Sequence, residues 1–158
     1  EIKVMMKLIK SNLQFNAGKL QKLIPNKVLL VILHHRAGNG DVESIHAQHL
    51  KNGWAGIGYH FYIRKDGAVY EGRPIAYVGS HCKGNNSCSL GVCLEGDFRK
   101  EVPTLEQLQA VRDVYKMVRK TYRNIYKMVN HRDLYKTACP CTDLAKLVEG
   151  IMNGNNKE

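Results

Sequence analysis

The sequence predicts a single α/β domain in which a central mixed β-sheet is flanked by about three helices. Residues 28–33 form a continuous apolar run rich in branched side chains, which is typical of a strand buried on both faces. Asp66 and Gly67 stand between two short strand-like segments, as in a β-hairpin. Apolar stripes with a helical period follow in the second half of the chain. A length of 158 residues suits one such domain.

The first half of the chain is expected to contain a basic arm, a buried strand, a short helix and a hairpin. Residues 1–26 are rich in lysine, and we assign them to an N-terminal arm in front of a domain that spans residues 27–158. After the buried strand, Asp41 or Ser44 can cap a short helix that continues to Leu50. After this helix we expect strands at residues 59–64, 68–70 and 90–94, with a turn at residues 65–67 between the first two.

Two helices are expected in the second half. Thr104 and Gln107 fit a capping box, in which each residue satisfies a backbone N–H of the other at the start of a long helix. The apolar stripe of this helix comprises Leu105, Leu108, Val111, Val114, Tyr115, Val118 and Tyr122. A final helix is expected over about residues 142–152. In a sheet covered by helices, functional side chains collect where strands end and in the loops beyond them.

The composition narrows the classes of partner. A formal net charge of +10 indicates an anionic partner or polyanionic surroundings. We expect no nucleic-acid binding, because aromatic residues are only 8% and no RRM, KH, zinc-finger or basic-zipper pattern is present. We expect no membrane insertion, because the apolar run at residues 28–33 is far shorter than the roughly 20 residues that a spanning helix needs. Anionic polymers of a cell wall would suit the basic surface as well, and the charge alone does not decide between partners.

The cysteines and the N-terminus indicate where the protein is made. Five cysteines are an odd number, and we expect all of them to be reduced, as in a protein folded in a cytosol. Cys93 lies in an apolar segment and is expected to pack in the core. No signal-peptide core is visible near Glu1, so we expect synthesis in the cytoplasm.

Two histidines and one cysteine form a candidate metal site. His34 ends the apolar run, and His131 precedes Cys139 by eight residues. Imidazole and thiolate ligands suit zinc, and three protein ligands leave one position open, as in catalytic zinc sites. Each residue also has a simpler interpretation: His34 as a hydrogen-bonded residue at the end of a buried strand, and Cys139 as a small buried hydrophobe. His46 and His49 are expected to be solvated positions on the short helix.

Short motifs across residues 28–143 occur in a characteristic order. They are Ile32–His35, Gly58–Phe61, Asp66–Gly67, Glu71–Arg73, Val78–His81, Ser89–Gly96, His131–Asp133 and Thr137–Pro140. Each motif alone is weakly specific, but the whole series in this order is highly specific. Together they resemble the type-2 N-acetylmuramoyl-L-alanine amidases, the family of phage T7-type lysozymes and animal peptidoglycan recognition proteins.

The resemblance implies one zinc ion held by His34, His131 and Cys139. It also implies that Tyr59 is a catalytic tyrosine, whose hydroxyl can hydrogen-bond the attacking water or the developing oxyanion. Thr137 stands two residues before the cysteine, where family members carry Lys or Thr. Its hydroxyl can donate a hydrogen bond to the oxyanion but cannot supply the positive charge of a lysine.

Four further residues are expected to line the substrate groove. They are His35, His60, Arg73 and His81. Arg73 can bind a peptide carboxylate with its guanidinium fork, although a structural ion pair is an equally simple role.

The activity implied by the resemblance is hydrolysis of the amide between N-acetylmuramic acid and L-alanine in peptidoglycan, by an endolysin or autolysin that acts at the cell wall after release or export. The alternative is a non-catalytic peptidoglycan-binding protein of the same fold, although such members usually lose a zinc ligand. A recycling amidase is disfavoured because those enzymes typically use Asp where this chain has Cys139.

The chain departs from the family pattern in two ways, and the second, a missing disulfide, places it nearer to the phage or bacterial branch. Cys141 stands where glycine often follows the Cys-Pro pair. No cysteine pair matches the disulfide that animal members commonly carry near their first helix.

Overall fold

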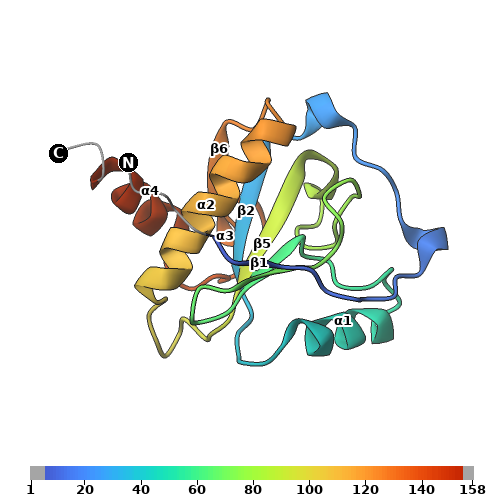
Figure 1. Ribbon diagram of the computed structural model, residues 1–158, viewed down its shortest axis with the longest axis horizontal. Helices are drawn as coiled ribbons and strands as arrows, with labels where there is room; N and C mark the ends of the chain where they lie inside the picture. The colour runs from blue at the N-terminus through green and yellow to red at the C-terminus, as the bar shows by residue number, and fades with distance from the viewer. Residues whose placement is uncertain (1–5, 155–158) are drawn as a thin grey trace.

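The computed structural model describes residues 6–154 and shows a six-stranded mixed sheet with helices on both faces (Figure 1). The strands are β1 (Leu8–Ile9), β2 (Leu30–His35), β3 (Phe61–Ile63), β4 (Val69–Glu71), β5 (Ser89–Leu94) and β6 (Lys127–Asn130). The helices are α1 (Val42–Lys51), α2 (Leu105–Thr121), α3 (His131–Leu134) and α4 (Leu144–Gly154). The strand order is β1-β4-β3-β5-β2-β6, in which β3 and β4 are antiparallel and all other neighbours are parallel.

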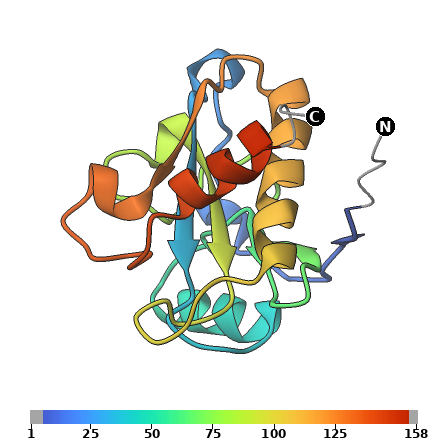
Figure 2. The ribbon, with the colours of Figure 1, turned by 90° about the vertical axis from the view of Figure 1, so that its left-hand side faces the viewer.

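The sheet is covered by different helices on its two faces. Helices α2 and α4 pack together over one face and enclose the main apolar core. Helix α1 packs on the opposite face, near one end of the strands (Figure 2). Within residues 6–154, no helix is both long enough and apolar enough to cross a membrane.

The alternation of side chains along β2 decides which residues face each layer. Val31 and Leu33 belong to the core under α2 and α4, whereas Ile32 belongs to a smaller cluster on the other face. Successive side chains of a strand point to opposite faces. His34 therefore lies on the same face as Ile32, and His35 lies on the face of Leu33.

The predicted fold class is confirmed, with one helix more than expected, and local signals placed several elements correctly. The Asp41 carboxylate accepts a hydrogen bond from the backbone N–H of Ser44 at 2.9 Å and caps α1. Thr104 and Gln107 form the predicted capping box of α2. Gly67 has a φ of +86° in the hairpin turn, a conformation that glycine adopts without steric cost.

Among the strands and α-helices, three were not predicted: β1, β6 and α3. Strand β1 lies in the predicted basic arm and pairs with β4 at the edge of the sheet, so residues 6–26 pack on the domain. A strand of two residues is too short to show any periodicity. Strand β6 has an exposed Lys127 and begins soon after a helix, and α3 is a single turn.

The prediction that His46 and His49 are solvated is wrong. Both are buried, with exposed fractions of 6% and 9%. Their Nδ1 atoms accept hydrogen bonds from the backbone N–H groups of Ile57 and Gly58, at 3.0 and 2.8 Å. Because the chain folds back over α1 after the helix ends, the histidines tie this returning segment to the helix.

Candidate metal centre and substrate pocket

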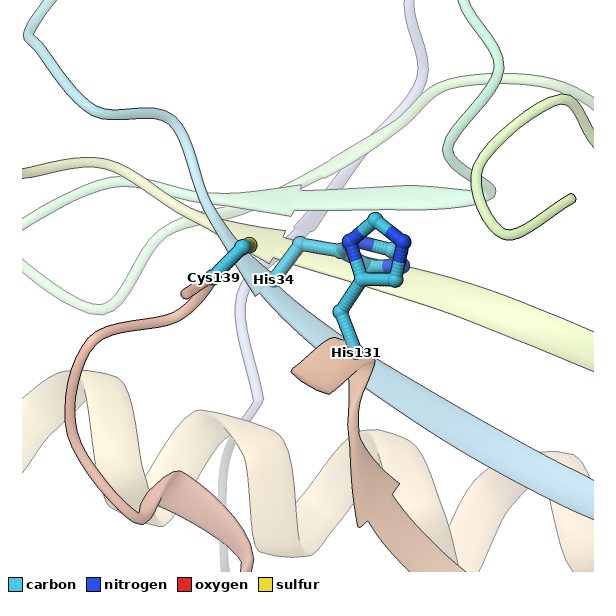
Figure 3. A group of neighbouring side chains, drawn as sticks. All are labelled: His34, His131 and Cys139. Carbon is cyan, nitrogen blue, oxygen red and sulfur yellow. The ribbon is translucent and has the colours of Figure 1, made fainter. Parts of the chain in front are cut away.

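Three side chains from separate segments meet at the carboxyl end of β2 (Figure 3). His34 belongs to β2, and His131 begins α3 directly after β6. The strands β2 and β6 are parallel, and Leu33 lies opposite Asn130. The residues that follow these two, His34 and His131, therefore lie side by side. Cys139 reaches the same place from the loop between α3 and α4.

The loop that carries Cys139 is held by backbone hydrogen bonds. The N–H of Arg132 donates to the Cys139 carbonyl oxygen at 2.8 Å. The Thr137 hydroxyl oxygen accepts a hydrogen bond from the N–H of Cys139 at 3.2 Å. The backbone N–H of His35 points at the sulfur atom, 3.5 Å away. These contacts keep the thiol at the end of β2.

The three side chains fit a zinc ion. Their ligand atoms lie within 4.8 Å of one another, and Nδ1 of His34 is 3.2 Å from Nδ1 of His131. Two nitrogens bound to one tetrahedral zinc ion lie roughly 3.3 Å apart. Two imidazoles and a thiolate also leave the fourth position of a tetrahedral ion open.

Burial controls the protonation of these ligands. It lowers the pKa of His34 well below the usual range, and the nearby His131 and His35 lower that pKa further. Burial also lowers the pKa of His131. The neutral imidazoles that result are the form that binds metal. Burial raises the pKa of the Cys139 thiol to about 11, so the thiolate needs a cation beside it at neutral pH.

The metal centre borders a pocket of about 470 Å³. The pocket is lined by His49, Trp54, Tyr59, Ser80, His81, Cys82, Lys83, Asn86, His131 and Tyr135. The ring of Tyr59 lies 5.1 Å from the ring of His34, measured between centroids. Burial raises the pKa of Tyr59 well above its usual range, so the phenol keeps its proton and remains a hydrogen-bond donor.

A second pocket, of about 490 Å³, lies between the N-terminal arm, β4 and α2. Its lining is mainly apolar and includes none of the three ligand residues. The chemistry of the donor set, rather than cavity size, therefore identifies the candidate active site.

Comparison with known proteins identifies the family. The N-acetylmuramoyl-L-alanine amidase family (Amidase_2) matches residues 25–142, most of the chain. The chain belongs to this family. The endolysin of Enterobacteria phage K11 is 42% identical to the amidase over 113 residues, which cover 68% of the amidase and 74% of the endolysin.

Solved structures share the fold of the amidase along nearly its whole length. The N-acetylmuramoyl-L-alanine amidase LysC from Clostridium intestinale is 34% identical, with a TM-score of 0.84, and the match covers 94% of this chain and 99% of LysC. A mutant of Drosophila PGRP-LB in complex with tracheal cytotoxin is 27% identical, with a TM-score of 0.76. That match covers 89% of this chain and 92% of PGRP-LB.

Three further predicted site residues of the amidase lie at the metal centre. Tyr59 lines the pocket. Thr137 lies beside Cys139, and because its oxygen accepts the N–H of Cys139, its hydroxyl proton is free for another acceptor. Nδ1 of His81 is 2.9 Å from Nε2 of His34, so His81 contacts a ligand residue directly.

The structure gives Arg73 and His60 internal contacts. The Arg73 guanidinium is buried and donates to three backbone carbonyl groups and to the Ser80 hydroxyl. His60 is buried between a backbone N–H of Gly91 and the carbonyl oxygen of Tyr77, at 3.0 and 2.7 Å. Both residues line the second pocket and neither lines the pocket at the metal centre, so their placement does not support a role in the groove.

His35 points away from the pocket on the other face of β2. Its Nδ1 atom accepts a hydrogen bond from the N–H of Phe98 at 3.1 Å, and its Nε2 atom lies 3.7 Å from the sulfur of Cys141. Cys141 has a φ of +67°, a conformation that favours glycine. All five cysteines lie within the described residues and are unpaired, and Cys93 is fully buried as predicted.

Several pocket residues were not predicted from the sequence. They are His49, Trp54, Lys83, Asn86 and Tyr135. The Trp54 side chain is 39% exposed, and its ring lies 4.5 Å from that of His49. The signal that could have identified Trp54 is its position as the single tryptophan, in the glycine-containing segment 52–56. An exposed aromatic residue in a loop is a frequent feature of binding sites.

Proposed function

We propose that this amidase is zinc-dependent and hydrolyses the amide bond between N-acetylmuramic acid and L-alanine in bacterial peptidoglycan. The observation that carries the proposal is the group His34, His131 and Cys139 at the edge of a pocket. This donor set is that of a catalytic zinc site with one open position. Membership of the N-acetylmuramoyl-L-alanine amidase family supports the choice of bond.

Residues of the chain have separate roles at the scissile amide bond. A zinc ion at this site supplies a Lewis acid that polarises the carbonyl and lowers the pKa of water. Tyr59, as a neutral phenol, donates a hydrogen bond toward the water or toward the oxyanion that develops on the carbonyl oxygen. Thr137 donates its free hydroxyl proton to the same oxyanion. Three donors or cationic groups on one oxygen would lower the barrier by stabilising charge that is absent from the substrate.

The pocket suits a muramyl peptide. Trp54 and Tyr135 offer aromatic surfaces for sugar and peptide groups, and Lys83 offers a positive charge for a carboxylate. The PGRP-LB complex with tracheal cytotoxin shows a related fold with a peptidoglycan fragment. We assign the carboxylate contact to Lys83 rather than to Arg73, whose guanidinium is occupied by backbone carbonyl groups.

The basic surface favours the same target. A net charge of +10 attracts the chain to anionic wall polymers, and this attraction weakens as salt increases. We therefore infer that the protein acts at the bacterial cell wall as an endolysin or autolysin.

The competing function is peptidoglycan binding without catalysis. The complete ligand set and the pocket tyrosine favour the enzyme, because a protein that only binds has no need for an open metal position.

Purified protein loaded with zinc and incubated with peptidoglycan provides the test. We expect free amino groups of L-alanine to appear without new reducing sugar ends, and a chelator to stop the reaction. New reducing ends would identify a glycosidase and contradict the proposal. Zinc binding and wall binding without any release of amino groups would favour the binding protein.

A further inference from the structure

His81 connects the metal centre to the sheet through a chain of hydrogen bonds. Its Nδ1 atom is 2.9 Å from Nε2 of His34, and its Nε2 atom is 3.2 Å from the hydroxyl oxygen of Ser89. The Ser89 hydroxyl in turn donates to the backbone carbonyl oxygen of Asn85 at 2.6 Å. We call these contacts the His34–His81–Ser89 relay.

The carbonyl group of Asn85 sets the direction of every hydrogen bond in the relay. A carbonyl oxygen can only accept, so Ser89 gives its single proton to Asn85 and can only accept from His81. This places a proton on Nε2 of His81. Both His81 and His34 are buried, which favours neutral imidazoles with one N–H each. Nδ1 of His81 is then an acceptor, and His34 donates to it from Nε2.

The consequence for His34 is a free lone pair on Nδ1. This is the nitrogen that faces His131, 3.2 Å from its Nδ1 atom. In the other neutral tautomer, the proton on Nδ1 of His34 would block metal binding at that position. The relay therefore selects the tautomer that can act as a ligand.

The residues around the His81 ring leave space for this orientation. A Cβ atom on Gly91 would lie 2.6 Å from Cγ of His81, and a Cβ atom on Gly79 would lie 2.7 Å from Cδ2. Only glycine leaves room for the imidazole at these two positions. The side-chain oxygen of Asn86 also accepts a hydrogen bond from the backbone N–H of His81 at 2.9 Å. The two glycines thus leave room for the ring, and Asn86 fixes the backbone of His81.

We propose that His81 is a positioning residue that, through Ser89, holds His34 as the Nε2-protonated tautomer and keeps its Nδ1 atom available to a metal ion. Metal-binding histidines commonly donate their second N–H to a fixed partner, and loss of that partner weakens metal binding about 10- to 100-fold. This role is additional to the predicted role of His81 in the substrate groove, because His81 also lines the pocket. The expected effect of His81 on metal binding rests on the proposed zinc centre. The expected tautomer of His34 does not.

The substitution Ser89→Ala tests the relay two hydrogen bonds away from the ligand atom. Without the hydroxyl acceptor, His81 can carry its proton on Nδ1 and donate to His34, which then takes its own proton on Nδ1. Long-range 1H–15N spectra of the metal-free, 15N-labelled protein report these tautomers. We expect Nε2-protonated His34 and His81 in the wild type, and a population of Nδ1-protonated His34 in the variant. Zinc affinity, measured by chelator competition, should fall about 10-fold.

Two variants separate the relay from general effects on the fold. Ser80→Ala removes a hydroxyl from the same pocket wall but not from the relay, and should leave the His34 tautomer and zinc affinity unchanged. In His81→Asn, an amide oxygen can accept the N–H of His34 without help from Ser89. Adding Ser89→Ala to His81→Asn should therefore cause no further loss of zinc affinity. Circular dichroism and thermal unfolding check that each variant is folded.

The outcomes distinguish this inference from the proposed function. If folded Ser89→Ala keeps the wild-type tautomers and zinc affinity, the relay is wrong and the amidase proposal stands. If the wild type binds no zinc, the proposed zinc dependence is wrong, and the tautomers of the metal-free protein still decide the relay. An equal loss of zinc affinity on Ser89→Ala in the wild-type and His81→Asn backgrounds would also contradict the relay, because the effect would not pass through His81.

Discussion

Nδ1 of His34 and Nδ1 of His131 lie 3.2 Å apart, although 97 residues separate the two histidines in the chain. The parallel pairing of β2 with β6 brings them together, and neither depends on a long loop for its position. Only Cys139 comes from a loop, and backbone hydrogen bonds hold that loop at the end of β2. Sites carried by rigid elements keep their geometry without a ligand, so two thirds of the metal centre is built by the sheet itself.

Replacement of the cysteine ligand should abolish the activity. In Cys139→Ser, zinc affinity and the release of amino groups from peptidoglycan should each fall more than about 100-fold, because even residues that only orient a ligand account for 10- to 100-fold. The fold should remain, since Cys139 is not part of the apolar core. Metal analysis and an amino-group assay measure the two effects. Cys141→Ser, two residues along the same loop, is the matched control and should keep both zinc affinity and the release of amino groups. Wild-type zinc content in Cys139→Ser would contradict the assignment of Cys139 as a ligand.

Removal of one hydroxyl group tests the role of Tyr59. Tyr59→Phe should lower kcat roughly 10²- to 10³-fold, the usual effect of losing a hydrogen bond to a developing oxyanion. KM and zinc content should change little, because the ring that lines the pocket is kept. Tyr62→Phe is the matched control, since its hydroxyl donates to the carbonyl oxygen of Gly40 at 2.8 Å and does not line the pocket. A kcat in Tyr59→Phe equal to that of the wild type would remove the tyrosine from the mechanism.

Local sequence signals predicted the parts of the fold that depend on neighbouring residues. The cap at Asp41 and the capping box at Thr104 each involve residues three positions apart, and both helices begin as predicted. The burial of His46 and His49 could not be predicted, because their partners belong to a segment that folds back after the helix. A polar helical residue shows no sign in the sequence of a distant backbone N–H group.

In the candidate site too, the types of the residues could be predicted from the sequence, whereas their contacts with distant residues could not. The ligands His34, His131 and Cys139 were proposed from their chemical types and from the family resemblance, and the structure brings them together. The role of Arg73 depends on its surroundings: an arginine binds a carboxylate or fixes a loop according to whether backbone carbonyl groups surround it. The link from His81 to a ligand was hidden for a similar reason, since 47 residues separate it from His34.

Cys141 offers a test of backbone strain beside the metal centre. Cys141→Gly should raise the free energy of unfolding by about 0.5–1 kcal/mol, because glycine adopts a positive φ without the steric cost that a side chain carries. Activity should be retained, since the contact between its sulfur and Nε2 of His35, at 3.7 Å, lies outside the pocket. Urea unfolding of the metal-free protein measures the change. Ala37→Gly, at a φ of +60°, is a matched control that should behave similarly. Loss of activity in folded Cys141→Gly would show that the thiol has a function.

Stability should fall in acid because buried histidines must remain neutral. Burial lowers the pKa of His60 from 6.5 to about 4, although its hydrogen bond to Tyr77 opposes this shift. Between these two values the unfolded chain binds a proton that the folded chain does not, so the free energy of unfolding rises with pH. The contribution of neutral His60 is complete above about pH 6.5 and is lost as the pH falls toward about 4, with a slope of about 1.4 kcal/mol per pH unit.

Urea unfolding between these pH values, with a chelator present to exclude effects of metal release, measures this slope. His60→Gln removes the titrating group and should give a slope that is lower by about one proton than the wild-type slope. Val92→Ala, which shortens a fully buried side chain on β5, is a matched destabilised control and should keep the wild-type slope. Equal slopes in His60→Gln and the wild type would show that His60 titrates alike in the folded and unfolded chains, and would contradict the prediction.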